Sequence, residues 1–230
     1  MKEDIQKFTH YLLEGDEVSC ESFINEMPDK EDVIKVFHFL TTAMQHIGEL
    51  WENNEITVAD EHLATATCDY VLSQYKYNHI TRKKGKSNGL KAMFFCLENE
   101  QHYLGTKIVS SIFEYYGWET RLFGANLPLE YAESQAKEWK PQLIGISVAI
   151  LYHLPKLKGY LDALSRIPNA PIMMVGGRLS GLYDLRQYST EETIILKSIQ
   201  DVQRWIMEHR TEGNKYGENN KHSSSLFSNQ

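Results

Sequence analysis

The spacing of hydrophobic residues changes near Gly89, and this change constrains the fold more than any other feature of the sequence. Before Gly89, apolar residues recur at intervals of three and four positions, which is typical of amphipathic helices. After Gly89, short apolar runs of strand length alternate with helical segments. The sequence therefore predicts a helical part followed by a part in which strands and helices alternate.

The first part predicts a bundle of four antiparallel helices joined by short turns. The second of these helices stops at Pro28, and the third runs from about Lys30 to Trp51. The segment 57-TVAD-60 is a capping box, in which the Thr57 and Asp60 side chains can each bond the other's backbone amide. It predicts the start of a fourth helix that continues toward Tyr77.

The second part predicts an α/β fold with a flavodoxin-like, five-stranded parallel sheet, because alternating strands and helices imply crossovers that cover both faces. The expected strands are 92-AMFFCL-97, 119-ETRLFG-124, 142-QLIGISV-148, 171-PIMMV-175 and 193-TIIL-196. The expected helices span roughly 104–117, 129–139, 154–166, 179–188 and 199–210.

The domain boundaries follow from these patterns and from composition. We expect a helical bundle over 1–80, a linker over 81–90, an α/β domain over 91–210 and a disordered polar tail over 211–230. The formal net charge of −7 makes the chain a poor match to a phosphate backbone, so direct DNA binding is not expected. The basic stretch 82-RKKGK-86 is best interpreted as a solvated linker.

The cellular compartment is indicated by what the sequence carries at its ends and at its cysteines. Cys20, Cys68 and Cys96 are widely separated and lack the spacing of metal ligands, which favours reduced thiols in a reducing compartment. We find no signal peptide and no apolar run long enough to span a membrane. The sequence predicts a cytoplasmic protein.

Polar and glycine residues follow three of the expected strands. The first strand is followed by Glu100, His102 and Gly105, the third ends at Ser147, and 176-GG-177 follows the fourth. In open α/β sheets, ligands bind beyond the carboxyl ends of the strands. Taken singly, each feature is explained by a polar loop or an ordinary turn, but together they predict one crevice that binds a cofactor.

The pattern Glu100-x-His102-x-x-Gly105, Ser147-x-Ala149 and 176-GG-177 resembles the signature of the cobalamin (vitamin B12)-binding domain family. That family has Asp-x-His-x-x-Gly, Ser-x-Leu and Gly-Gly on a five-stranded flavodoxin-like fold, preceded by a helical-bundle cap over the upper face of the corrin. Glu100 departs from the commoner Asp, and Ala149 departs from Leu.

The resemblance implies a role for each residue of the pattern. His102 would displace the cofactor's own base and ligate cobalt from below, which suits an imidazole nitrogen, and Glu100 would fix its tautomer. Gly105 would leave room for the corrin to approach the backbone. Gly176, Gly177 and the Ser147 hydroxyl would form the slot for the displaced nucleotide tail.

The helical part also resembles one branch of the family. Trp51, Glu61 and His62 match the Trp-x9-Glu-His signature of adenosylcobalamin-dependent photoreceptors that regulate transcription. There, Trp packs over the adenosyl group, and after photolysis the residue corresponding to His62 ligates cobalt from above. The alternative is a purely structural role, in which Trp51 belongs to the core and Glu61 and His62 occupy a helix start. We find no room for the DNA-binding head of those proteins.

The leading hypothesis from the sequence is a light-responsive cobalamin sensor that signals through a protein partner and not through DNA or a membrane. Adenosylcobalamin is the favoured cofactor, with methylcobalamin as the other form. The alternative is a corrinoid methyl-carrier protein of a methyltransferase system, which would make the chain an enzyme component. A module that has lost its cofactor is a third reading, mutase chemistry is disfavoured, and the existence of a homo-oligomer is left open.

Overall fold

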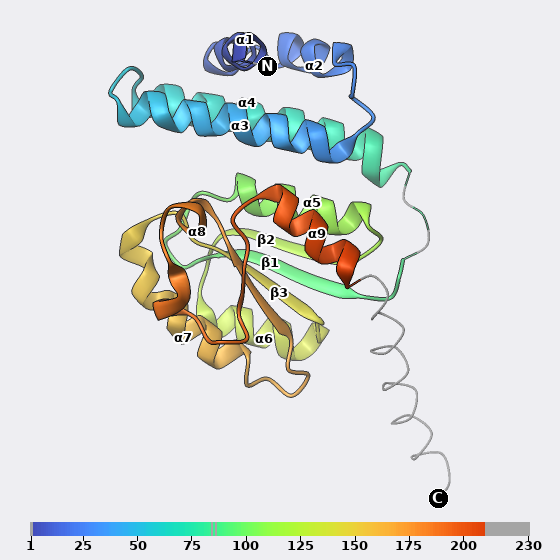
Figure 1. The fold of residues 1–230 in the computed structure, drawn as a ribbon, viewed down its shortest axis with the longest axis vertical. Coiled ribbons are helices and arrows are strands. Elements are labelled where there is room, and N and C mark those ends of the chain that lie inside the picture. Colours follow the sequence, from blue (N-terminus) through green and yellow to red (C-terminus); the bar gives the residue numbers. More distant parts are fainter. Residues whose placement is uncertain (1, 84, 86, 210–230) are drawn as a thin grey trace, which may run out of the picture. The chain divides into compact units, whose positions relative to one another are not determined.

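The chain forms two compact units that divide after Lys84. The structure is a computed structural model, and it describes residues 2–83, 85 and 87–209. Figure 1 shows the helices of the first unit and the sheet with its helices in the second. The tail predicted over 211–230 lies outside the described residues, as do two positions of the predicted linker, and both assignments stay predictions.

The first unit contains the predicted four helices. They are α1 (Lys2–Leu13), α2 (Glu17–Glu26), α3 (Val33–Glu52) and α4 (Val58–Lys76), and α4 continues into a π-helical turn, η1 (Tyr77–Thr81). The third helix starts later than expected from Lys30, because the Asp32 side chain accepts the amides of Ile34 and Lys35 and so caps the helix there. The capping box at Thr57 and Asp60 is confirmed.

The core of the first unit is made by the apolar stripes of its helices. The rings of Phe8, Phe23 and Phe39 pack together, with centroids 5.1 to 5.6 Å apart, and they join α1, α2 and α3. Burial of such stripes, more than intrinsic helix propensity, stabilises helices of this length. In the described residues no helix is long and apolar enough to cross a membrane.

The second unit contains the predicted parallel sheet. Its strands are β1 (Lys91–Leu97), β2 (Glu119–Leu127), β3 (Leu143–Ser147), β4 (Ile172–Gly176) and β5 (Ile194–Ile195). Its helices are α5 (Leu104–Tyr115), α6 (Leu129–Trp139), α7 (Leu154–Leu164), α8 (Arg178–Leu182) and α9 (Ile199–Glu208). The helix expected over 179–188 is instead the short α8 and a 3-10 turn, η3 (Leu185–Tyr188), which the Asp184 side chain caps.

The strand order is β2-β1-β3-β4-β5, and every pair is parallel. Helices α5 and α9 cover one face of the sheet, and α6 and α7 cover the other (Figure 1). The chain reverses direction of winding between β1 and β3, which is where ligands bind in folds of this kind. The register pairs Cys96 with Ser147 and Ser147 with Gly176, so the carboxyl ends of β1, β3 and β4 lie side by side.

The central strands are buried on both faces, as expected for a covered parallel sheet. The core on the side of α6 and α7 includes Phe95, Ile146, Val175, Leu157 and Leu161. All three cysteines lie in the described residues, and Cys20, Cys68 and Cys96 are buried and form no disulfide. The prediction of reduced thiols therefore agrees with the structure.

Candidate functional site

The loop that follows β1 is held in place by the end of the neighbouring strand. Asn99 adopts a left-handed conformation with φ of 70°, which asparagine tolerates better than most residues. Its amide donates to the Asn126 side chain (2.8 Å), and the Asn126 amide donates to the Glu100 carbonyl (3.0 Å). These two hydrogen bonds tie the loop that carries Glu100 to the end of β2, at the carboxyl edge of the sheet.

Glu100 is completely buried. Oε1 accepts from the backbone amide of His102 (3.1 Å) and lies 2.5 Å from its Nδ1. Oε2 accepts from the amides of Ala149 (2.9 Å) and Ile150 (3.1 Å) and lies 3.1 Å from Nδ1 of His153. Burial alone would raise the pKa of this carboxyl, but these hydrogen bonds outweigh it and lower the pKa to about 2.

The His102 ring is oriented by Glu100. Since the carboxylate is ionised at neutral pH and can only accept, Nδ1 of His102 must carry the proton. The tautomer follows from this bond, and it leaves Nε2 as the nitrogen with a lone pair for a metal. The side chain is 56% exposed, so the imidazole lies at the mouth of the sheet and not inside it. The pairing predicted for Glu100 and His102 is direct.

Ser147, Gly176 and Gly177 meet beside this loop, at the ends of β3 and β4. Gly177 has a φ of +106°, and a Cβ there would lie 2.4 Å from the Val148 carbonyl oxygen and 2.9 Å from the Ser147 hydroxyl. Only glycine fits this position. Ser147 is buried, and a Cβ on Gly176 would meet only the Leu196 carbonyl, at 3.8 Å. The backbone of β3 and the turn after β4 thus approach closely because side chains are missing.

Gly105 lies in the first turn of α5 and faces open space, since no heavy atom lies within 4 Å of where its Cβ would be. The absence of a side chain is therefore not required by packing. A corrin and its nucleotide tail need an oriented imidazole, backbone that is free of side chains, and a slot at the strand ends. His102, Gly105 and the glycine pair 176–177 provide these three features. The residues present fit the group that the sequence pattern implies.

Three groups that the sequence analysis did not single out also belong to this site. They are the buried imidazole of His153, on the 3-10 turn η2 (Leu151–His153), and the backbone amides of Ala149 and Ile150. No linear motif marks them, because they reach Glu100 from the loop after β3, about fifty residues along the chain. The amide of Ala149 contributes whatever its side chain, so the departure from Leu does not remove this contact.

The Cys96 thiol lies below the His102 loop. Its Sγ is 3.3 Å from the Thr106 hydroxyl and 3.6 Å from the His102 carbonyl oxygen. Burial raises the pKa of this thiol to about 11, against smaller opposing effects of hydrogen bonds with Thr106 and Ser147. The thiol is therefore protonated and packs as a small apolar group that supports the loop.

The residues predicted to act on the upper face belong to the first unit. Trp51 lies in the last turn of α3 and is 45% exposed, and His62 lies in the first turns of α4 with its side chain 76% exposed. Glu61 Oε2 lies 2.7 Å from Nδ1 of His62. The structure brings Glu61 and His62 together, and it places Trp51 at the same end of the bundle. The alternative that Trp51 is a core residue is wrong.

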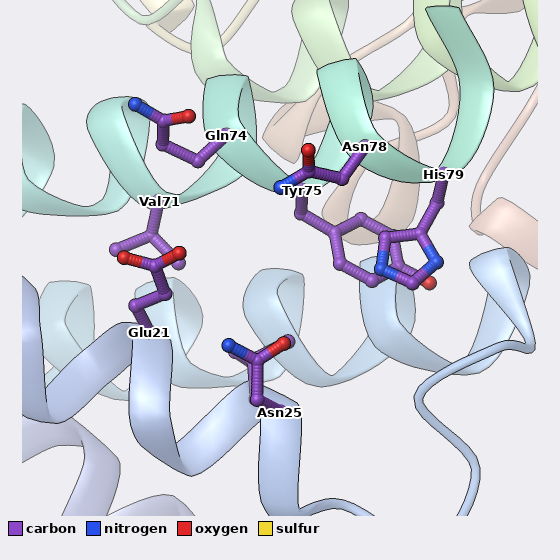
Figure 2. A pocket seen from close by; sticks show the side chains of 8 residues that line it. Glu21, Asn25, Val71, Gln74, Tyr75, Asn78 and His79 are labelled. Carbon is purple, nitrogen blue, oxygen red and sulfur yellow. The ribbon is translucent and has the colours of Figure 1, made fainter. Parts of the chain in front are cut away.

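A small pocket in the first unit lies between α2 and α4. Figure 2 shows Glu21 and Asn25 of α2 opposite Val71, Gln74 and Asn78. The Tyr75 ring stacks on the His79 ring with centroids 4.2 Å apart, and the Tyr75 hydroxyl donates to the Lys30 carbonyl (2.6 Å). These contacts hold the end of α4 against the turn before α3, so the pocket is explained by packing.

Comparison with known proteins agrees with this geometry. Two family models, each described as a B12 binding domain, match residues 4–76 and 90–191. Trimethylamine corrinoid protein 2 of Methanosarcina acetivorans is 24% identical over 149 residues, covering 64% of this chain and 68% of that protein. The monomethylamine corrinoid protein of Methanosarcina barkeri has the same fold, with a TM-score of 0.69, 17% identity, and coverage of 90% of this chain and 98% of that chain.

The two matched regions fall one in each unit, and they agree with the family that the histidine motif predicted. These relatives do not support the closer resemblance to photoreceptors, which stays a prediction. The predicted cobalamin cofactor is supported by both models. On the evidence of its sequence motif, its fold and both matched regions, this chain belongs to the cobalamin (B12)-binding protein family.

Proposed function

We propose that the chain is a corrinoid methyl-carrier protein of a methyltransferase system and that it holds cobalamin with His102 as the lower axial ligand. The observation that carries the proposal is the fully buried Glu100 with the exposed His102 imidazole held on its Oε1. The name of the relative from Methanosarcina acetivorans, a corrinoid protein for trimethylamine, favours this function over the light sensor. It reverses the order of preference that the sequence alone suggested.

When bound, cobalamin would supply a cobalt centre that accepts and releases a methyl group. The residues of the chain bind and orient it. Glu100 keeps the proton of His102 on Nδ1 and thereby offers Nε2 to the metal, and the negative charge makes the imidazole a stronger donor. Gly105 leaves the backbone accessible, and Ser147, Gly176 and Gly177 form the slot proposed for the nucleotide tail.

The proposal also sets expectations for cofactor form and partner. Methylcobalamin, which the sequence ranked second, is the form that a methyl carrier would present, and adenosylcobalamin is the form that a sensor would need. A carrier must work with protein partners, so one or more methyltransferases are the proposed partners. A regulatory protein partner is expected only if the chain is a light sensor.

Binding provides the first test. The apo chain is titrated in the dark with methylcobalamin, for wild type and for His102→Ala, and the visible spectrum reports loss of the cofactor's own base from cobalt. We expect His102→Ala to bind at least about tenfold more weakly, by analogy with the losses seen when metal ligation is disturbed. His209→Ala, in the same unit and stacked on Trp205, is the control. Equal affinity of His102→Ala and wild type would refute ligation by His102.

Methyl transfer provides the second test. The cobalamin-loaded chain is reduced, supplied with a methyl donor, and then mixed with a corrinoid-dependent methyltransferase and its thiol acceptor. A carrier gains and loses the methyl group stoichiometrically, and the loss requires the added enzyme. A chain that binds cobalamin through His102 but never delivers the methyl group is not a carrier.

The light sensor is the second candidate, favoured by the exposed His62 held by Glu61 and by the exposed Trp51 at the same end of the bundle. It predicts that illumination of the adenosylcobalamin-loaded chain changes its assembly state, measured by size-exclusion chromatography. His62→Ala should abolish that change while leaving binding intact. The carrier hypothesis predicts no difference between dark and illuminated samples.

A further inference from the structure

The Glu100 carboxylate joins two loops that are distant in the sequence. One oxygen is used by the loop after β1, through the amide and ring of His102. The other oxygen is used by the loop after β3, through two amides and the ring of His153. We propose that His153 is a positioning residue for His102, acting through Glu100, and this inference rests on the proposed role of His102 as the lower ligand.

The surroundings of His153 favour this role over a surface contact. The residue is 5% exposed, and its Nδ1 lies 3.1 Å from Glu100 Oε2. Oε2 of Glu100 acts as an acceptor for the amides of Ala149 and Ile150, and Nδ1 of His153 is the donor in the third contact to this oxygen. His153 also precedes Leu154 and Pro155 at the start of α7, which fixes its backbone.

Of the donors to Oε2 among the described residues, the His153 side chain is the one that depends on residue type. Ala149 and Ile150 donate through backbone amides, which any residue but proline supplies. Without Nδ1 of His153, the Glu100 carboxylate loses the donor that precedes α7 and that helps to fix the plane of the carboxylate. The position of Oε1 follows that plane, and the orientation of His102 Nδ1–H follows Oε1.

The chemistry predicts which substitutions preserve the arrangement. An asparagine amide nitrogen occupies the same δ position as Nδ1 of histidine, so His153→Asn keeps a donor toward Glu100. Leucine has nearly the same branching at the γ carbon but offers no donor, and the amide of glutamine lies one bond farther out. If His153 only fills space, leucine should serve as well as asparagine. If it positions Glu100, asparagine should serve better than both.

The experiment uses the full chain, uniformly labelled with ¹⁵N and loaded with unlabelled cobalamin, which is then reduced to the cobalt(II) form. Electron paramagnetic resonance identifies the lower ligand: ¹⁵N of a protein histidine splits each line into a doublet, whereas ¹⁴N of the cofactor's own base gives a triplet. Wild type, His153→Asn, His153→Leu and His153→Gln are compared, with His209→Leu as a control for the same substitution outside the site. The melting temperature of each apo chain is measured beside it.

We expect the doublet in wild type and in His153→Asn, and a several-fold smaller doublet fraction in His153→Leu and His153→Gln at similar melting temperatures. If His153→Leu does not fold, the doublet fractions of His153→Asn and His153→Gln are compared instead. Equal doublet fractions in all variants, or losses that only follow the melting temperature, would overturn the positioning role. If the wild-type spectrum shows no doublet, ligation by His102 is refuted, and so is the positioning role of His153. If the doublet is present but the chain transfers no methyl group, only the carrier function is refuted.

Discussion

At the scale of single residues, the site depends on a carboxylate that is buried and yet ionised. A buried charge is costly unless hydrogen bonds replace its hydration, and Glu100 has five such contacts. The longer side chain of Glu, compared with the Asp that the family pattern favours, reaches both the His102 loop and the loop after β3. The departure from the family pattern is therefore a structural feature of this chain.

Substitution of Glu100 by Gln should reveal this arrangement in the apo protein. One oxygen becomes an amide group that faces donors on either side, so at least one hydrogen bond is lost and two donors oppose each other. We expect the free energy of unfolding to fall by about 1–3 kcal/mol, measured by urea denaturation. Glu133→Gln, which disturbs only the partly exposed ion pair with Lys137, should change it by less than about 1 kcal/mol. Equal effects of the two substitutions would contradict the account.

Gly177 offers a second residue-scale test, because its conformation and its surroundings both exclude a side chain. Gly177→Ala should lower the free energy of unfolding by about 1–3 kcal/mol from backbone strain, with the contact to the Val148 carbonyl adding to it. Gly159→Ala in α7 meets nothing within 4 Å and should be neutral or stabilising, since alanine favours helices. The melting temperatures of both variants test this prediction. An unchanged melting temperature in Gly177→Ala would contradict the claim that position 177 has no room for a side chain.

The histidine motif could be found from the sequence because its residues lie within six positions of one another. Gly176 and Gly177 could be added because the carboxyl ends of parallel strands meet at one edge. His153 could not, since its contact with Glu100 depends on the path of a loop that no local pattern specifies. The burial of Glu100 could not be predicted for the same reason, because the hydrogen bonds that hold its loop involve Asn126 of another strand.

At the scale of elements, helix starts decide where the chain changes direction. The capping box at Thr57 was predictable because its two partners are three residues apart, and it fixes the start of α4 close to Glu61 and His62. The expected helix over 179–188 is interrupted, because Asp184 caps a new turn at the point where continuation was expected.

Thr57→Ala tests the contribution of this cap. Loss of the hydroxyl removes the hydrogen bond that it accepts from the Asp60 amide and the one that it donates to the Asp60 carboxylate. We expect the first unit to lose about 1 kcal/mol of stability. Thr42→Ala is the matched control: the Thr42 hydroxyl bonds the His38 carbonyl within α3, and alanine is the better helix former there. Circular dichroism during urea denaturation should separate the two variants. Equal free energies of unfolding for Thr57→Ala and Thr42→Ala would contradict a contribution of the cap.

At the scale of the whole molecule, the division after Lys84 places two cysteines in the first unit and one in the second. Burial raises the pKa of Cys20 to about 12 and that of Cys96 to about 11, so these two thiols keep their protons in the folded chain at pH 8. Labelling with a thiol reagent should therefore require opening of the unit that contains each cysteine. Mass spectrometry of peptides labelled along a urea gradient should report the two units separately, and rapid labelling without urea would contradict the burial.

The thiols of Cys20 and Cys96 also determine how the stability of the fold changes with pH. In the unfolded chain they ionise near 9.0, whereas in the folded chain they keep their protons to a higher pH. Above pH 9 the unfolded state therefore binds fewer protons than the folded state, and stability should fall as pH rises through that range. Cys20→Ala should weaken this fall, as measured by melting temperature between pH 8 and 10. A slope that is unchanged in the variant would contradict the assignment.

The central claim is that His102 of this chain, and not the cofactor's own base, is the lower ligand of bound cobalamin. The most direct measurement is the electron paramagnetic resonance spectrum of the ¹⁵N-labelled wild-type chain that carries unlabelled cobalamin in the cobalt(II) form. The account predicts a doublet that disappears in His102→Ala. A triplet from the retained base, or lines without nitrogen splitting, would contradict it.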